Sequence, residues 1–159
     1  MQVKEFSEKQ QFTQLWLWCL LIASFLLPCL MPVLSNDDVE FLNDDSRIVL
    51  ILGLVFCLFF YLLELRVSVN SEGIHYQFFP LHLKSYIIKY DEIERVEAVT
   101  YSPIMDYGGW GIRFRYNAKA YNVKGKEGVK VYLKNGRHIL FGSQRNTTFA
   151  NAIIGFMKT

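Results

Sequence analysis

The side chains that most often carry out chemistry are few in this chain of 159 residues. The histidines are His75, His82 and His138, too few and too scattered to predict a metal-ligand set. All three cysteines lie inside apolar runs, where a thiol behaves as a small hydrophobic side chain. We therefore predict no metal site, no cofactor and no catalytic residue.

Carboxylates and glycines give no catalytic or nucleotide-binding motif either. The acidic pair Asp91 and Glu92 has no nucleophile beside it and is predicted to be surface charge. The run Gly109-Trp-Gly111 lacks the third glycine of a dinucleotide fingerprint and opens a strand rather than a helix. One enzymatic alternative stays open, in which His138 or His82 acts with a carboxylate in a cleft.

Basic residues supply the candidate binding sites. Residues 110–116 alternate, which predicts that Trp110, Ile112, Phe114 and Tyr116 point to the core side and that the arginines between them are exposed. A second basic cluster surrounds the turn at Gly125 and Gly128. The six candidate residues, for the carboxylates of a partner or for anionic lipid, are Arg113, Arg115, Lys119, Lys124, Lys126 and Lys130. Nucleic acid is not predicted, because no recognition helix or stacking motif accompanies these charges.

Two apolar runs precede this basic region. Residues 15–34 contain no charge and would be about 30 Å long as a helix, the thickness of a bilayer core. Residues 48–65 form a shorter run, bracketed by Arg47 and Arg66. Both are predicted to be transmembrane helices, and neither has an ionisable residue well inside it, which argues against an ion pathway. A cleaved signal peptide is the alternative for the first run.

Charge predicts the side of the membrane. The loop 35–47 carries five acids, and its only basic residue is Arg47 at the edge of the second run, whereas residues 66–159 carry 14 basic and 7 acidic groups, a net charge of +7. Lys and Arg are disfavoured in translocated loops, so the loop is predicted to be external. The N-terminal segment 1–14, either a short interfacial helix or disordered, and the C-terminal region are predicted to be cytoplasmic, which gives a multi-pass protein of the cell membrane.

The cytoplasmic region 66–159 is predicted to contain mainly short strands. Alternation and turn residues place them at 66–70, 74–79, 85–90, 95–101, 110–116, 120–123, 129–133 and 137–141. Asn135-Gly136 predicts a two-residue type I′ hairpin that sets Leu133 opposite His138. Asn146 is the expected N-cap of an amphipathic helix at 147–157.

Two stretches give a family resemblance. The strand boundary Ile88-Lys-Tyr-Asp-Glu-Ile-Glu-Arg-Val96, followed by Tyr101-Ser-Pro103 and Gly108-Gly-Trp-Gly-Ile-Arg113, resembles bacterial pleckstrin-homology-like domains of small two-span membrane proteins. The resemblance covers residues 66–145 and departs from the family pattern in the longer connection 118–128. It implies a two-helix transmembrane hairpin followed by a mostly-β (α+β) antiparallel barrel that the C-terminal helix caps, and it carries over no catalytic residue.

The expected function is that of a membrane-anchored, non-enzymatic interaction module at the inner membrane surface. Its expected partners are the lipid bilayer and another membrane protein or a second copy of itself, with no small-molecule substrate. Binding of anionic lipid through the basic surface is the alternative, and a small membrane-bound enzyme is a further one. A transporter subunit is disfavoured by the absence of polar residues from the apolar runs.

Overall fold

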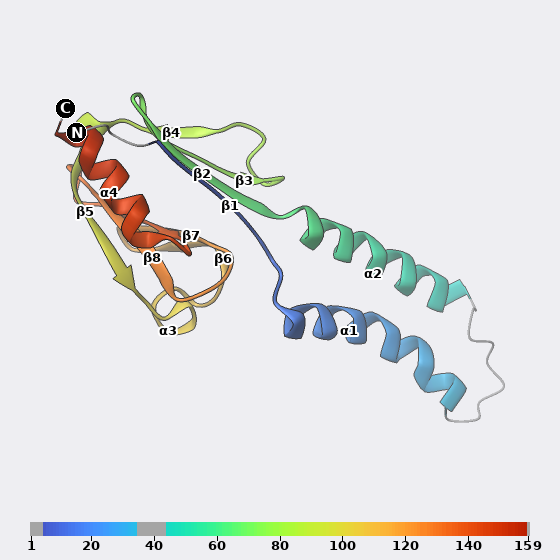
Figure 1. The fold of residues 1–159 in the computed structure, drawn as a ribbon. Coiled ribbons are helices and arrows are strands. Elements are labelled where there is room, and N and C mark those ends of the chain that lie inside the picture. The colour runs from blue at the N-terminus through green and yellow to red at the C-terminus, as the bar shows by residue number, and fades with distance from the viewer. Residues whose placement is uncertain (1–4, 35–43, 159) are drawn as a thin grey trace. The chain divides into compact units, whose positions relative to one another are not determined.

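The computed structural model describes residues 5–34 and 44–158. The chain divides into two compact units, one of residues 1–11 and 63–159 and one of residues 12–62. The first unit contains two β-sheets with short helices, and the second contains two longer helices (Figure 1).

The helical unit is an antiparallel pair formed by α1 (Leu15–Leu34) and α2 (Asp44–Leu62). Gly53 on α2 faces Phe25 on α1 so closely that a Cβ atom built at position 53 would lie 2.7 Å from the Phe25 Cβ. The rings of Phe25 and Phe56 have centroids 5.9 Å apart, and the thiol of Cys29 donates to the carbonyl oxygen of Ser46 at 3.7 Å. The absence of a side chain at Gly53 therefore lets these two helices approach closely.

The expected two-span hairpin is wrong. Within the described residues, α2 is the one helix long and apolar enough to cross a bilayer. Over the described side chains of α1 the apolar stretch is Leu15–Met31, which is shorter. Residues 35–43 of the expected external loop 35–47 lie outside the described residues. Its last four residues, 44–47, form the start of α2.

Sheet A has the strand order β1-β2-β3-β4, and all its neighbours are antiparallel. Its strands are β1 (Phe6–Gln11), β2 (Glu64–Asn70), β3 (Gly73–Phe79) and β4 (Tyr86–Ile88). Side chains alternate along β2 and β3, so that Leu65, Val67 and Ile74 are buried. The N-terminal segment, expected to be a short helix or disordered, thus supplies a strand of this sheet.

Strand β1 is fixed by contacts with the C-terminal part of the same unit. Phe6 stacks on Phe149 with ring centroids 4.7 Å apart. The carboxylate of Glu8 accepts hydrogen bonds from Ser143 Oγ at 2.6 Å and from the Gln144 backbone N–H at 2.9 Å. The buried Gln10 side chain donates to the Gly142 carbonyl oxygen at 2.7 Å. Residues more than 130 positions apart in sequence therefore complete one core.

Sheet B has the strand order β5-β8-β9-β7-β6. Its strands are β5 (Ile93–Thr100), β6 (Gly111–Arg115), β7 (Ala118–Asn122), β8 (Glu127–Leu133) and β9 (His138–Gly142). β7 and β9 are parallel, and the other neighbours are antiparallel. Three helices complete the unit: the 3₁₀ turn η1 (Tyr90–Glu92), α3 (Pro103–Tyr107) and α4 (Asn146–Met157).

The expected pleckstrin-homology-like barrel is also wrong. The unit has two separate open sheets, and sheet B ends at β5 on one side and at β6 on the other. The C-terminal helix is present as α4, and it contacts β5 and β8 of sheet B and β1 and β2 of sheet A. Its buried face includes Phe149 and Ile153, as the helical spacing predicts. The helix cap is Arg145 rather than the expected Asn146.

The β8–β9 hairpin differs by one residue from its expected register. Tyr132, rather than Leu133, lies opposite His138. A type I′ turn needs positive φ at both central residues. Only Gly136 has it, at +78°, and Gly136 N–H donates to the Leu133 carbonyl oxygen at 3.0 Å. The loop therefore contains three residues and ends in a left-handed glycine. The shift pairs Val131 with Ile139, so that Leu140 lies on the opposite face of the sheet from Val131.

Candidate functional site

Two hairpin turns meet at one end of sheet B because β7 and β9 run parallel. Ala118 at the start of β7 is paired with His138 at the start of β9, so the turns that precede these strands lie at the same edge. The His138 N–H donates to the Asn117 carbonyl oxygen at 3.0 Å, which joins the β6–β7 turn to the β8–β9 turn. Asn117 adopts a φ of +56°, a conformation that asparagine tolerates well.

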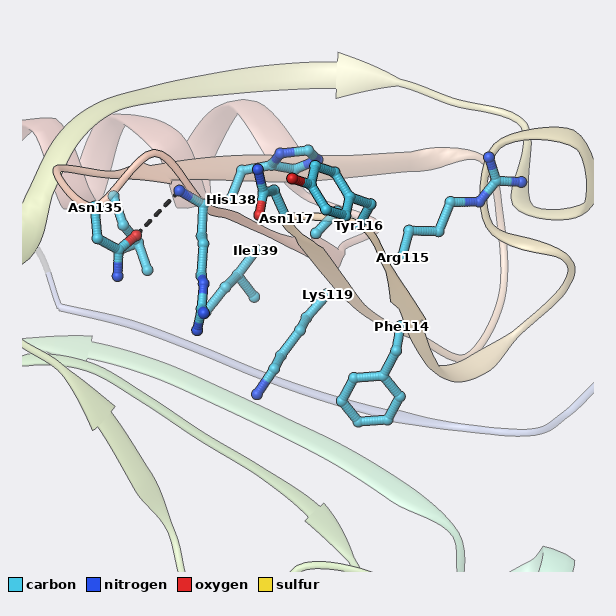
Figure 2. A pocket seen from close by; sticks show the side chains of 11 residues that line it. Phe114, Arg115, Tyr116, Asn117, Lys119, Asn135, His138 and Ile139 are labelled. Carbon is cyan, nitrogen blue, oxygen red and sulfur yellow. Dashed lines mark hydrogen bonds between the residues drawn. The ribbon is translucent and has the colours of Figure 1, made fainter.

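A groove of about 460 Å³ lies between these turns, and we call it the hairpin groove (Figure 2). Its apolar side chains are those of Phe114, Tyr116, Ala118, Leu133 and Ile139. Its polar side chains are those of Arg115, Asn117, Lys119, Asn135, Arg137 and His138. The lining thus combines two aromatic rings with three permanent positive charges and contains no carboxylate.

The aromatic rings of the groove are exposed. Phe114 is 69% and Tyr116 96% exposed. The Lys119 Nζ atom lies 5.5 Å from the centroid of the Phe114 ring, and both side chains extend from the same side of the β6–β7 hairpin (Figure 2). A cation over an aromatic face is attracted to the negative face of the ring. A ligand in the groove would therefore meet a charged group and an apolar surface together.

The cations of the groove are not neutralised by acids of the same unit. No carboxylate of the described residues lies within 4 Å of the side-chain nitrogen atoms of Lys119 or Arg137. The Arg115 guanidinium donates to the Met105 carbonyl oxygen at 3.2 Å, which fixes it against α3 but leaves its charge unpaired. The groove is therefore electropositive and has room for the acidic groups of a ligand.

The backbone of the groove is held rigidly. The Asn135 side-chain oxygen accepts a hydrogen bond from the Arg137 backbone N–H at 3.0 Å, the contact drawn as a dashed line in Figure 2. Such a bond is typical of asparagine in turns. Gly136 follows with its positive φ. These local interactions orient the Arg137 backbone before any ligand binds.

The histidines are placed differently from the enzymatic alternative. His138 lines the groove, and burial together with the nearby charge of Lys130 lowers its pKa. The Nδ1 atom of His82 accepts a hydrogen bond from the Phe78 backbone N–H at 3.3 Å. Burial and Lys119 lower the pKa of His82 as well. In the described part of the chain neither histidine lies within 4 Å of a carboxylate.

The six basic residues predicted as binding sites are divided between the ends of sheet B. Arg115 and Lys119 line the hairpin groove. Lys124 and Lys126 follow the far end of β7, and Lys130 lies on β8 with Glu97 opposite it on β5. Arg113 is exposed on β6 outside the groove lining. The structure therefore brings two of the six together in the groove and adds Arg137, which is not one of the six.

The predicted burial of the aromatic residues of the groove is wrong. The alternation of residues 110–116 predicted that Phe114 and Tyr116 face the core, but β6 is an edge strand and both rings are exposed. Trp110 is half-buried, and its indole N–H donates to the Gly125 carbonyl oxygen at 3.4 Å. The pair Tyr116-Asn117 indicates that the strand ends in a turn at this point, because asparagine favours turns.

No protein-family model matches the chain, and no curated protein matches it. The membrane-protein family suggested by residues 88–113 stays a prediction, although the barrel that it implied is not the fold of the structure.

Proposed function

We propose that the chain is a membrane-attached, non-enzymatic interaction module whose two-sheet unit binds an acidic segment of a protein partner in the hairpin groove. One observation carries this proposal. The groove contains three permanent cations beside two exposed aromatic rings and no acidic side chain. Arginine and aromatic residues are enriched among the side chains that dominate binding energy at protein interfaces.

The apolar surface of α2 supports attachment to a membrane. Most of its leucines and isoleucines are exposed, among them Ile51 at 62% and Leu54 at 71%. Within α2 charges are confined to the first turn, at Asp44, Asp45 and Arg47. A helix that is apolar on all sides is stable in lipid rather than in water. We place the two-sheet unit on the cytoplasmic side because residues 66–159 carry a net charge of +7.

The chemistry of the groove favours a peptide with carboxylates near an apolar side chain. Asp or Glu would accept hydrogen bonds from the Lys119 ammonium and the Arg137 guanidinium, and such charge-assisted bonds are among the strongest in proteins. An apolar neighbour in the peptide would cover the Phe114 ring. Binding through exposed charges also weakens as the salt concentration rises.

A photo-crosslinking amino acid in place of Tyr116 tests the proposal in the full chain and in its native membrane. We expect a protein adduct whose yield falls at least about tenfold in the double variant Lys119→Glu and Arg137→Glu, because each lost charge-assisted bond is worth about 1.5–3 kcal/mol. The matched control reverses two exposed charges away from the groove, Lys89→Glu and Lys158→Glu, and should leave the yield unchanged.

Three results distinguish the possible occupants of the groove. An adduct with the mass of two chains identifies a second copy as the partner. An adduct with lipid alone contradicts the protein partner and supports the anionic-lipid alternative. An adduct that persists in the groove variant at the control level shows that the groove cations do not bind the partner.

A further inference from the structure

The loop between β3 and β4 presents two leucines to its surroundings. Leu81 is 55% and Leu83 82% exposed, and Lys84 follows them. His82 lies between the leucines in sequence and packs inward, with its ring 4.8 Å from that of Tyr86 and 5.6 Å from that of Tyr121. The loop thus alternates, with the histidine inside and the leucines outside.

Hydrogen bonds fix this arrangement. The His82 N–H donates to the Phe78 carbonyl oxygen at 2.8 Å, and the Phe78 N–H donates to the His82 ring nitrogen at 3.3 Å. The Gln77 side chain donates to the His82 carbonyl oxygen at 3.0 Å. The exposure of Leu81 and Leu83 is therefore built into the turn, and both side chains are available to contact another phase or molecule.

The register of sheet A places this loop at the end of the sheet where the chain connects to α2. Phe79, the last residue of β3, is paired with Glu64, and Glu64 is paired with Gln11. Gln11 and Leu63 are the residues at which the chain leaves and re-enters the two-sheet unit. Leu62, the end of the candidate span α2, is two positions before Glu64. The leucine loop therefore begins at the end of sheet A that is covalently joined to the apolar segment.

We propose that loop 80–85 docks on the bilayer surface, with Leu81 and Leu83 below the headgroups and Lys84 at the level of the lipid phosphates. This inference rests on the membrane attachment in the proposed function. Lysine beside apolar side chains is suited to such an interface, because its alkyl stem can be buried while the ammonium group reaches the headgroups. Tyr86, 51% exposed, adds an aromatic side chain of the kind enriched there.

Tethering makes a small loop sufficient for docking. The chain already holds the loop near any membrane in which α2 is embedded, so binding is intramolecular and its effective concentration is high. A second copy or a protein partner would need a larger complementary surface than two leucines and one lysine. The bilayer needs no shape complementarity, which is why we choose it as the occupant.

Lipid-borne quenchers test the docking in the full chain. In a background with Cys19, Cys29 and Cys57 replaced by Ala, Leu83→Cys carries an environment-sensitive fluorophore. The matched control is Ser71→Cys, at an exposed position in the β2–β3 turn at the opposite end of sheet A. Both proteins are reconstituted into phosphatidylcholine–phosphatidylglycerol vesicles with and without spin-labelled lipid.

We expect spin-labelled lipid to quench the probe at position 83 several-fold more than the probe at position 71, and its emission to shift to shorter wavelength. Equal, weak quenching at both positions in vesicles that float together with the protein overturns the docking alone. Protection of position 83 from aqueous iodide without quenching by lipid also overturns it, because a protein then covers the loop. Failure of the chain to float with vesicles overturns the membrane attachment as well.

Discussion

Among single residues, His82 connects local packing to the pH dependence of stability. Its Nδ1 atom must be unprotonated to accept the Phe78 N–H, and the Lys119 charge and burial both disfavour the imidazolium form. Burial, the larger cause, and Lys119 therefore lower its pKa in the folded protein relative to about 6.5 in the unfolded chain.

The sign of the effect follows from proton binding. Between the lowered folded pKa and about 6.5, the unfolded chain binds more protons than the folded one, so stability falls as the pH falls through this window. We expect His82→Asn, whose side-chain oxygen can accept the same hydrogen bond, to reduce the loss of stability between pH 7 and pH 5. Chemical denaturation at several pH values measures it. His138, whose pKa is lowered too, accounts for a residual slope.

An unchanged pH profile in His82→Asn would show that the imidazole is not desolvated in solution. His75→Asn is a suitable control, since His75 lies beside Glu72 at the β2–β3 turn, with 3.5 Å between Nε2 and Oε2. Its replacement should leave the effect of His82 intact.

Among the elements, the α1–α2 pair depends on Gly53. A side chain at this position meets Phe25, with 2.7 Å to its Cβ from an added Cβ atom. We expect Gly53→Val to push the helices apart, at a cost of about 1–3 kcal/mol, the usual range for overpacking. Gly53→Ala should have a smaller effect in the same direction.

A thiol-reactive dye measures this separation in detergent. Cys29 is 3% exposed between the helices, and in a background without Cys19 and Cys57 its labelling reports opening of the pair. The temperature at which Cys29 reacts should fall in Gly53→Val. The same change at Leu54, which is 71% exposed, should leave that temperature nearly unaltered. Equal shifts in both variants would contradict a specific role of Gly53.

Local sequence patterns predicted most helices and strands. The errors arose where pairing between strands distant in sequence sets the structure. Each of the eight strands expected between residues 66 and 141 has a counterpart in β2 to β9, because alternation and turn residues are properties of neighbours in sequence. The short helix α3 was missed although Ser102 caps it, Pro103 opens it and Gly108 ends it. The hairpin groove depends on the parallel pairing of Ala118 with His138, which no local pattern reveals.

The incorrect barrel and the failure to predict β1 have related causes. Strand number suggested closure, but the order β5-β8-β9-β7-β6 leaves sheet B open at both ends. β1 was not predicted, because its sequence Phe-Ser-Glu-Lys-Gln-Gln contains a single large apolar residue. Its place in the sheet is set by Glu8 and Gln10, whose partners lie at residues 142–144.

At the scale of the whole molecule, residues 12–62 are an insertion in the fold of the two-sheet unit. Gln11 and Glu64 face each other in neighbouring antiparallel strands, so a tight turn could join them. We expect a chain in which a short Asn-Gly turn replaces residues 12–62 to fold cooperatively in water. Circular dichroism and a single cooperative denaturation transition measure this.

The fragment 63–159 is the matched comparison. It lacks β1, so the Phe149 ring loses its stacking partner Phe6 and the Ser143 hydroxyl, fully buried, loses the Glu8 carboxylate. An unsatisfied buried donor costs about 1–3 kcal/mol, in addition to the lost apolar contact. We expect this fragment to be much less stable than the joined chain. Equal stability of the two would show that β1 is dispensable.

The pairing of β1 with β2 also sets an order of events during synthesis. Phe6–Gln11 leaves the ribosome more than 50 residues before Glu64–Asn70, which completes the pair. At about 5–20 residues per second this delay is about 3–10 s, long compared with hairpin formation in about 1–10 μs. Throughout that interval the first strand is a nascent edge without its partner, and the apolar helices are made before it can close. The ribosome thus releases the first strand of the sheet well before the sheet exists.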